Sequence, residues 1–449
     1  MKSNRRGFLG GGVAAAIGFL GGAGESANGA ALGSTRLHGA AATGRGAGAG
    51  LEAPGAGDGA AAGSETTTGA GGSAGIDAPL PVQTPDVPRL DYELDGDVKV
   101  FRLRAEVVSR EFVPGRSFDV WGYNGSCPGP TIEVNQGDRV RVIVENRLPE
   151  ATSMHWHGFE IPIEMDGIPG VVQDPIPPGG TFTYEFTLHQ HGTFFYHSHM
   201  PMQEMMGLIG LFIMHPREAY EPAVDQDFGM ILQEWSLLAT NSVPDSMSME
   251  FNWLTINGRA GPHTTPLIVR LGDRVRIRMV NLGMDHHPMH LHGNTFHVTA
   301  TEAGRVPEAA WAPQNTVLVG VAQARDIEFD ARYPGDWMLH CHLPHHMMNQ
   351  MVPMVGPSPA HQAHGGAEMP MPMEGMQHRP SEAPLVPGYP QDMFMAMDEM
   401  VAKPETHGLR PTWSAGVMGM MTLVRVLPDE LYEEVRRLQA EAAGAGGGR

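Results

Sequence analysis

The sequence repeats itself, and this internal repeat constrains the fold more than any other feature. A pentapeptide that begins at Gly137 recurs 135 residues later at Gly272, and a His-x-His-Gly motif recurs at the same shift. The matched segments are 137–141 with 272–276, 155–158 with 290–293 and, at a shift of 143, 192–199 with 335–342. A length of 449 residues alone would suggest about three domains. The repeat instead predicts a core made of two copies of one domain.

Alternating apolar and polar residues predict β-strands in both copies. The predicted strands are 98–108, 131–134, 139–144 and 181–186 in the first copy, and 267–270, 274–280 and 325–329 in the second. Turn-forming Asn-Gly and Pro-Gly pairs separate the strands, and no helical period lies between them. Short strands at this spacing are typical of an all-β fold, so we expect two Greek-key β-sandwich or barrel domains.

Disordered extensions are expected on both sides of this core. Of the 58 glycines, 23 lie in the first 80 residues, and no aromatic residue occurs between Phe19 and Tyr92. Such a stretch cannot bury enough apolar surface to offset its ordering entropy. The predicted divisions are 1–45 for an export signal, 46–90 for a Gly/Ala/Pro-rich linker, 91–220 for the first domain, 221–356 for the second, 357–383 for a Met/His/Pro-rich segment, and 384–449 for a C-terminal extension with a short helical pattern.

The first residues suggest export. Arg5 and Arg6 precede a weakly hydrophobic, Gly/Ala-rich run that ends at about Ala23. A twin-arginine pair in this context indicates a signal for the export of folded proteins. The run is too short and too rich in glycine to span a bilayer comfortably. We therefore expect a periplasmic or extracellular protein with no membrane span in its mature form.

Charge and cysteine content exclude two classes of protein. The chain has 30 Lys+Arg and 50 Asp+Glu, a formal charge of −20, so a nucleic-acid partner is not expected. Only two cysteines, Cys127 and Cys341, are present, which excludes a disulfide framework. The 22 histidines and 30 methionines point instead to imidazole and soft sulfur ligands for a metal.

Four histidine clusters carry the predicted chemistry. Residues two apart on a strand share a face, so each His-x-His pair can present two imidazoles to one metal cluster. The last cluster adds a thiolate, an imidazole and a thioether, and two His, one Cys and a weak axial Met are typical of a blue copper centre. The candidate metal ligands are His155, His157, His197, His199, His287, His290, His292, His340, Cys341, His342, His346 and Met351.

These clusters, together with Asn-Gly-Ser-Cys-Pro-Gly-Pro-Thr at 124–131, resemble the multicopper oxidases, the family of laccases, ascorbate oxidase and bacterial cuprous oxidases. The resemblance covers residues 91–356 and implies two cupredoxin-like domains and four coppers per active unit: one type 1, one type 2 and two type 3. It implies type 1 ligation by His287, Cys341 and His346 with Met351 axial. It assigns His155 and His290 to type 2, and the type 3 ligands are His157, His197, His199, His292, His340 and His342. It further implies that four one-electron oxidations of substrate are coupled to the reduction of O2 to water.

The spacing of the motifs matches two-domain laccases. Only 88 residues separate His199 from His287, too few for a third complete domain. In two-domain relatives the subunits close into a ring, which implies a homotrimer with each trinuclear site between two chains. The positions equivalent to the type 1 ligands Cys341, His346 and Met351 are occupied in the first domain by Ser198, Gln203 and Leu208. The first domain is therefore expected to hold no blue copper.

Asp166 is the candidate catalytic residue. It lies eleven residues after His155, where the family commonly has an acid near the cluster, and we expect it to relay protons. The alternative is a turn-forming Asp-Gly pair, because Gly167 follows. A second acid that some relatives carry after the last type 1 histidine is replaced here by Met347.

The reducing substrate is left open between phenols, aromatic amines, Cu(I) and other metal ions. The Met/His-rich segment at 357–383 suits Cu(I), which keeps a copper-tolerance cuprous oxidase open, although the segment also reads as a flexible linker. A non-catalytic periplasmic copper-binding protein is the alternative from another class. A copper nitrite reductase is disfavoured because Ser198 stands where that enzyme needs a cysteine.

Overall fold

The computed structural model describes residues 79–237, 241–349 and 396–446. All of these residues belong to one compact unit, residues 74–449. The predicted export signal, Met351 and the Met/His-rich segment at 357–383 lie outside the described residues. In the described ranges, no helix is long and apolar enough to cross a membrane.

The first half of the chain forms two sheets. One has the order β1-β2-β5-β7, with β3 pairing to β2, and the other has the order β4-β9-β8-β6. The strands are Glu93–Asp95 (β1), Val98–Val113 (β2), Arg116–Tyr123 (β3), Gly129–Asn135 (β4), Arg139–Asn146 (β5), His155–His157 (β6), Thr181–Thr187 (β7), Gly192–His197 (β8) and Ile209–His215 (β9). Alternate residues of β5 are buried, as the period of a half-buried strand requires. Phe101 of β2 and Phe212 of β9 are buried in one cluster, so the two sheets share a core.

The second half repeats this topology. Its sheets have the orders β11-β10-β13-β19-β15-β16, with β17 pairing to β15, and β12-β21-β20-β14-β18. The strands are Gln226–Trp235 (β10), Trp253–Ile256 (β11), Leu267–Arg270 (β12), Arg274–Asn281 (β13), His287–Leu291 (β14), Phe296–Thr301 (β15), Gly304–Arg305 (β16), Pro313–Gln314 (β17), Thr316–Val319 (β18), Gln323–Asp330 (β19), Gly335–Cys341 (β20) and Met421–Leu427 (β21).

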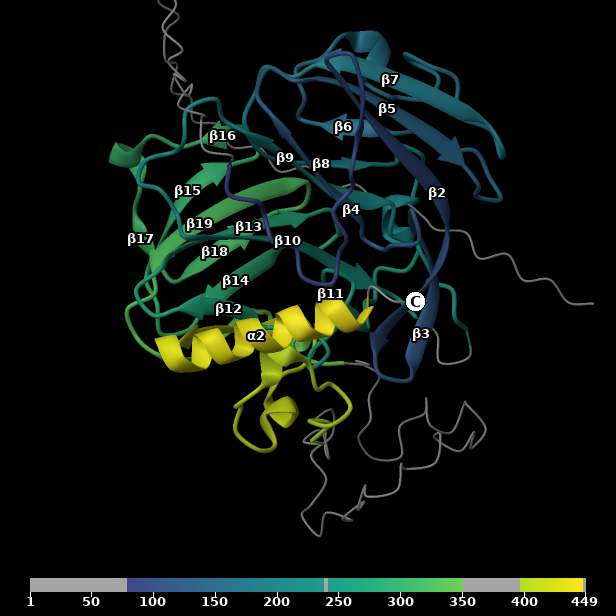
Figure 1. Cartoon of the computed structure of the whole chain (residues 1–449). Helices are drawn as coiled ribbons and strands as arrows, with labels where there is room; N and C mark the ends of the chain where they lie inside the picture. The colour runs from purple at the N-terminus through teal and green to yellow at the C-terminus, as the bar shows by residue number, and fades with distance from the viewer. Residues whose placement is uncertain (1–78, 238–240, 350–395, 447–449) are drawn as a thin grey trace, which may run out of the picture. The chain divides into compact units, whose positions relative to one another are not determined.

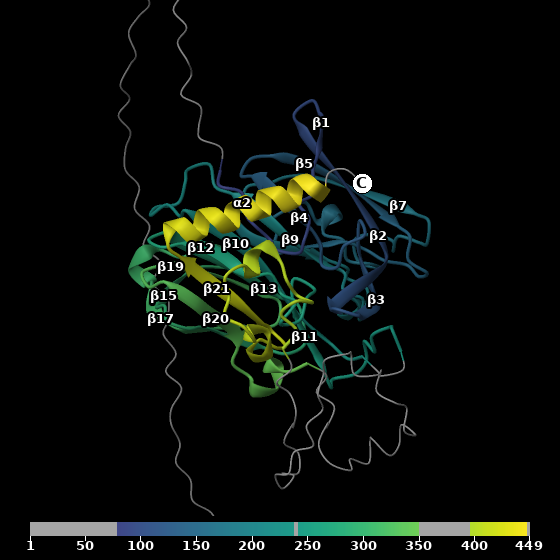
Figure 2. The same cartoon turned by 60° about the horizontal axis from the view of Figure 1, so that its bottom comes forward.

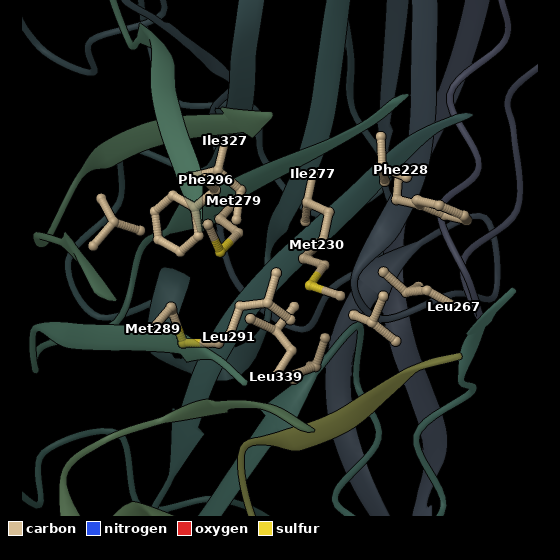
Figure 3. Packing of buried hydrophobic residues seen from close by; sticks show 14 of the residues in the cluster. Phe228, Met230, Leu267, Ile277, Met279, Met289, Leu291, Phe296, Ile327 and Leu339 are labelled. Atoms are coloured by element: carbon tan, nitrogen blue, oxygen red, sulfur yellow. The ribbon is translucent and has the colours of Figure 1, made fainter. Parts of the chain in front are cut away.

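The repeat in the sequence is a repeat in the structure. The order β10-β13-β19 matches β2-β5-β7, and β12-β21-β20-β14 matches β4-β9-β8-β6. Figure 1 shows the strands of the first half in purple to teal and those labelled in the second half, from β10 to β19, in teal to green. Figure 3 shows part of the core of the second half, where Ile277 and Met230 lie side by side. The expectation of an all-β fold is confirmed.

The sequence analysis predicted that the second domain ends at residue 356, but the structure shows that the domain continues beyond it. Strand β21, which was assigned to the C-terminal extension, pairs in parallel with β12 and antiparallel with β20. All of its residues are buried. Without β21, both β12 and β20 would expose unpaired backbone groups along one edge. The long segment between β20 and β21 is therefore an insertion within the domain.

The C-terminal helix follows β21 directly. It is α2 (Asp429–Gly446), which agrees with the short helical pattern read from the sequence. Its buried Val435 and half-buried Leu431 pack against Ile268 of β12 and Leu427 of β21. Figure 2 shows α2, in yellow, crossing above β12.

The folded part of the chain also includes residues before the predicted boundary at residue 91. Val82 is buried, Gln83 forms a β-bridge with Phe228, and the Leu90 amide donates to the carbonyl of Thr131. The last residues of the predicted linker are thus hydrogen-bonded to strands of the folded part. Short 3₁₀ turns complete the elements at Ile163–Met165, Glu204–Met206, Glu308–Ala310, Pro344–Met347, Pro404–Thr406 and Trp413–Gly416.

The two halves share a packed boundary. Apolar side chains of β8 and β9 are buried against β10, β13 and β19 in one cluster. Beside them Arg278 is 2% exposed and pairs with Asp227 and Asp326, at 2.8 and 3.3 Å. The Thr193 hydroxyl of β8 donates to Asp326 at 2.7 Å. This buried network fixes β8, which carries one histidine motif, against the second half.

Candidate metal centres

The first half-site consists of His155, His157, His197 and His199. His155 and His157 are the two ends of β6, and His155 is directly opposite His197 at the end of β8. Directly opposite residues of an antiparallel pair share one face of the sheet. The ring centroid of His155 lies 5.7 Å from that of His157, 5.2 Å from that of His197 and 5.3 Å from that of His199. Four imidazoles therefore surround one small volume.

Hydrogen bonds decide which nitrogens in this half-site are free. His155 Nδ1 is 2.8 Å from the carbonyl of Asp166, and His197 Nδ1 is 2.8 Å from the carbonyl of Ser198. A nitrogen facing a carbonyl must carry the proton, so Nε2 of both rings keeps its lone pair. Burial and the neighbouring histidines lower the pKa of His157 to about 4. At pH 7 the His157 ring is therefore in the neutral form that binds metals.

The second half-site, His290, His292, His340 and His342, has the same construction. His290 of β14 is directly opposite His340 of β20. The ring centroid of His290 lies 4.8, 5.6 and 5.5 Å from those of His292, His340 and His342. His290 Nδ1 faces the carbonyl of Asn315 at 2.7 Å, and His340 Nδ1 faces that of Cys341 at 2.8 Å. Again Nε2 is the free nitrogen.

The two half-sites do not meet within one chain. In the part of the chain that the structure describes, no hydrogen bond or ring contact joins a histidine of one half-site to a histidine of the other. The two half-sites also line different pockets. All four histidines of the first half-site line a pocket together with Met202, Glu204 and the 282–284 loop. His290 of the second half-site lines another pocket, together with Asn294 and Arg332. Each half-site is therefore open on one side.

A third cluster, the mononuclear site, consists of His287, Cys341 and His346. Cys341 Sγ lies 3.4 Å from His346 Nδ1 and 3.8 Å from His287 Nδ1, and the two nitrogens are 3.3 Å apart. All three side chains are fully buried. His287 begins β14, Cys341 ends β20, and His346 lies in the Pro344–Met347 turn.

Burial sets the protonation of the mononuclear site. It raises the pKa of Cys341 to about 12 and, with the nearby His287, lowers the pKa of His346 to about 3. His346 is thus neutral at pH 7, and the thiol loses its proton only when a cation takes its place. His346 Nε2 is buried without a hydrogen-bond partner, 3.4 Å from Asp285 Oδ2.

Glu234 is a residue of this site that the sequence analysis missed. One carboxylate oxygen lies 2.9 Å from His287 Nε2, and the other accepts from the Asp285 amide at 2.7 Å and from the Met284 amide. Both Glu234 and His287 side chains are 0% exposed. The contact fixes Nδ1 of His287 as the nitrogen facing Cys341. The signal for it was an isolated acid within the otherwise uncharged run 229–235 of β10.

Two acids lie against the first half-site. Asp166 Oδ1 is 3.4 Å from His155 Nδ1, so the predicted proton-relay residue is beside a candidate ligand. Gly167 follows at φ +81°, and a Cβ there would lie 1.7 Å from the carbonyl of Met154, so the Asp-Gly pair also forms a close turn. Glu204, which the sequence analysis did not single out, lies 3.0 Å from His197 Nδ1.

The first domain has a counterpart of the mononuclear site without metal-binding residues. Thr152, Ser198 and Gln203 occupy the places of His287, Cys341 and His346 in the repeat. Gln203 Oε1 accepts hydrogen bonds from Ser198 at 2.7 Å and from Thr152 at 2.8 Å. A closed hydrogen-bond network thus fills this position.

Comparison with known proteins agrees with this geometry. Two multicopper oxidase family models match residues 106–219 and 236–359, one on each domain. The blue copper oxidase from Nitrosomonas europaea is 31% identical and superposes with a TM-score of 0.52 over 56% of this chain and 81% of that one. The chain belongs to the multicopper oxidase family. Its two domains are accordingly cupredoxin-like.

Curated relatives of this multicopper oxidase are longer than the regions they share with it. Copper resistance protein A of Escherichia coli is 37% identical over 134 residues, 30% of this chain and 22% of that protein. Laccase-1 of Cryptococcus neoformans is 30% identical over 311 residues, 56% of this chain and 50% of that protein. The chain therefore spans half or less of these relatives.

The residues present fit the copper that the family carries. Two imidazoles and a thiol are the blue copper donor set. In each half-site two ring nitrogens of neighbouring histidines approach closely, His157 with His197 at 3.2 Å and His292 with His340 at 3.0 Å. At this distance one imidazole N–H can donate to the lone pair of the other ring, so each pair of nitrogens can share a proton. A copper ion would take the place of that proton in each half-site.

Proposed function

We propose that this protein is an oxidase that takes electrons singly from a small reducing substrate at a type 1 copper and reduces O2 at a trinuclear cluster. Type 1 copper would be held by His287, Cys341 and His346; type 2 and type 3 coppers would be held by the two half-sites. When bound, copper supplies the one-electron chemistry and the four-electron reduction of O2 to water. The observation that carries the proposal is the His340-Cys341-His342 segment. Cys341 belongs to the mononuclear site, and its two neighbours in the chain belong to the second half-site, so the two sites are joined through adjacent residues.

We infer that the trinuclear site forms between subunits. The open half-sites of a single chain support this, because each presents four imidazoles and lacks the other four. A ring in which the first domain of one chain meets the second domain of the next completes every site, and two-domain laccase-like relatives suggest a homotrimer. A fully active monomer in light scattering would contradict this assembly.

Asp166 is the proposed proton-relay residue. Its carboxylate lies beside His155, a proposed type 2 ligand, and its main chain accepts that ring's Nδ1 proton. Asp166→Asn keeps the carbonyl contact and the turn but removes the titratable group. The variant should keep its copper content and lose O2 turnover with an altered pH profile, since a relay needs a group that exchanges protons. An unchanged rate and profile would rule the relay out.

The proposed substrates are phenols, aromatic amines, Cu(I) or other reducing metal ions. The names of the relatives, a laccase and a copper resistance protein, support both kinds of donor. Export by the twin-arginine route, to the periplasm or outside the cell, remains a proposal from Arg5 and Arg6. The deciding experiment is oxygen uptake by copper-loaded protein with a phenol and with Cu(I), alongside the thiolate-to-copper absorption band. A loaded sample that shows the band but consumes no oxygen with any donor would favour a non-catalytic copper-binding protein.

A further inference from the structure

Strands β9 and β21 hold equivalent places in the two domains, and so do the residues just before them. Leu208 precedes β9, and Met420 precedes β21. The Ser198 amide donates to the Leu208 carbonyl at 3.2 Å, and the Cys341 amide donates to the Met420 carbonyl at 3.0 Å. Met420 is therefore the structural counterpart of Leu208, although the sequence spacing had paired Leu208 with Met351.

A second pair of hydrogen bonds repeats this equivalence. The Leu208 amide donates to the Gln203 carbonyl at 3.3 Å, and the Met420 amide donates to the His346 carbonyl at 2.9 Å. Gln203 and His346 themselves occupy equivalent positions in the repeat. The backbone of Met420 is thus hydrogen-bonded to the backbone of two residues of the mononuclear site, Cys341 and His346.

The turn before Met420 is built for this close approach. Gly419 has φ +63°, and a Cβ there would lie 2.3 Å from the His346 carbonyl oxygen, so only glycine fits. Its amide donates to Asn349 Oδ1 at 3.0 Å, and its carbonyl accepts from the Gly261 amide at 2.8 Å. Gly207 precedes Leu208 with a positive φ in the same way. These contacts hold the turn against the mononuclear site.

The Met420 side chain lies on the inner face of the sheet. The β20–β21 register ends at the pair His340 and Met421; continued by one residue, it places Met420 opposite Cys341, where such pairs share a face. Met420 is 0% exposed and belongs to the same apolar cluster as Cys341. A thioether beside two imidazoles and a thiolate is the usual weak fourth donor of a blue copper site. We propose that Met420, rather than Met351, supplies the axial thioether of the type 1 copper, an inference that rests on the proposed function.

Two other methionines are the rivals. Met351 was assigned from its spacing ten residues after Cys341, and it lies outside the described residues. Met289 is opposite Cys341 on the other side, through β14. Figure 3 shows the Met289 sulfur beside Leu291 in the apolar core. Of Met289 and Met420, only Met420 bonds to the backbone of both Cys341 and His346.

The test compares four single variants of the full-length, copper-loaded protein: M420L, M420Q, M351L and M289L. The readouts are the type 1 reduction potential, the visible absorption spectrum and the electron paramagnetic resonance spectrum. Leucine removes a donor that stabilises Cu(II), so M420L should raise the potential; glutamine offers a harder oxygen donor, so M420Q should lower it. M351L and M289L should leave the potential and both spectra unchanged.

Met→Leu is a volume-conserving exchange, so M420L should fold and load copper even if M420Q does not. Circular dichroism and copper content check this for each variant. Wild-type potential and spectra in M420L, or a shift in M351L or M289L alone, would overturn the assignment while leaving the type 1 site intact. A wild-type protein that loads copper but shows no thiolate-to-copper band would instead overturn the proposed function.

Discussion

Replacing Glu234 with glutamine should weaken copper binding at the mononuclear site without unfolding the protein. The carboxylate accepts a hydrogen from His287 Nε2 at 2.9 Å and from the amides of Met284 and Asp285. A glutamine of the same shape has one acceptor oxygen, so it must turn its NH2 group toward either the imidazole N–H or the two amides. At least one buried donor then loses its partner.

The size of the effect follows from that loss. A buried donor without a partner costs about 1–3 kcal/mol. If the imidazole N–H is the donor that loses its acceptor, His287 is no longer held with Nδ1 toward Cys341. Loss of a hydrogen-bond partner that orients a metal ligand typically lowers metal affinity about 10–100-fold. Because about 1.4 kcal/mol corresponds to a factor of ten, the two estimates agree.

The assay is a competition titration of copper against a chelator, followed by the thiolate-to-copper band. Glu302→Gln is the matched control, since Glu302 is an acid of the same domain that pairs with Arg325 and has a 36% exposed side chain. The dissociation constant should rise about 10–100-fold for Glu234→Gln and less than about twofold for the control. An equal effect in both variants, or none in either, would refute the role given to Glu234.

The protonation of the mononuclear site, the buried ion pairs of Arg278 and the turn at Gly419 each give a further prediction. Because the pKa of Cys341 is about 12 and that of His346 about 3, copper binding to the metal-free site displaces one proton near neutral pH. Affinity should therefore rise about tenfold per pH unit from about pH 6 to 9, and a flat profile in chelator titrations would contradict this. Arg278→Met removes the ion-pair partner of the buried Asp326 and one of the two arginines that pair with the buried Asp227. It should lower the free energy of unfolding in urea by about 3–5 kcal/mol, whereas a loss below about 1 kcal/mol would show that these ion pairs contribute little to stability. Gly419→Ala should reduce the copper content of the mononuclear site. The control Gly96→Ala should not, because Gly96 has φ +65° but open space around it. Equal copper content in the two variants would contradict a role of the Gly419 turn in holding the site.

Local patterns in the sequence account for most of the fold. The strands read from alternation at 139–144, 267–270 and 274–280 correspond to β5, β12 and β13. The repeat at a shift of 135 predicted that both domains have one topology, and they do. The His-x-His spacing worked for the same reason, because two residues apart on a strand is a local geometric relation.

Long-range relations could not be read in this way. Strand β21 is separated from β20 by a long insertion, so its pairing leaves no trace in local spacing. Glu234 reaches His287 across 53 residues, and an acid in a buried strand does not reveal its partner. Met420 was missed because the axial ligand was sought at a fixed distance from Cys341. In each case the contact joins residues far apart in the sequence, and no periodic pattern predicts their separation.

The central claim is that two half-sites on different chains complete one trinuclear copper cluster. It is tested by co-expressing two differently tagged variants, one with His157→Ala in the first half-site and one with His292→Ala in the second, and by isolating oligomers that contain both. In any mixed trimer one junction joins an intact first domain to an intact second domain, so oxygen uptake should return to about a third of the wild-type rate per trimer. Each variant alone should be inactive. Mixed oligomers as inactive as the separate variants would contradict the account.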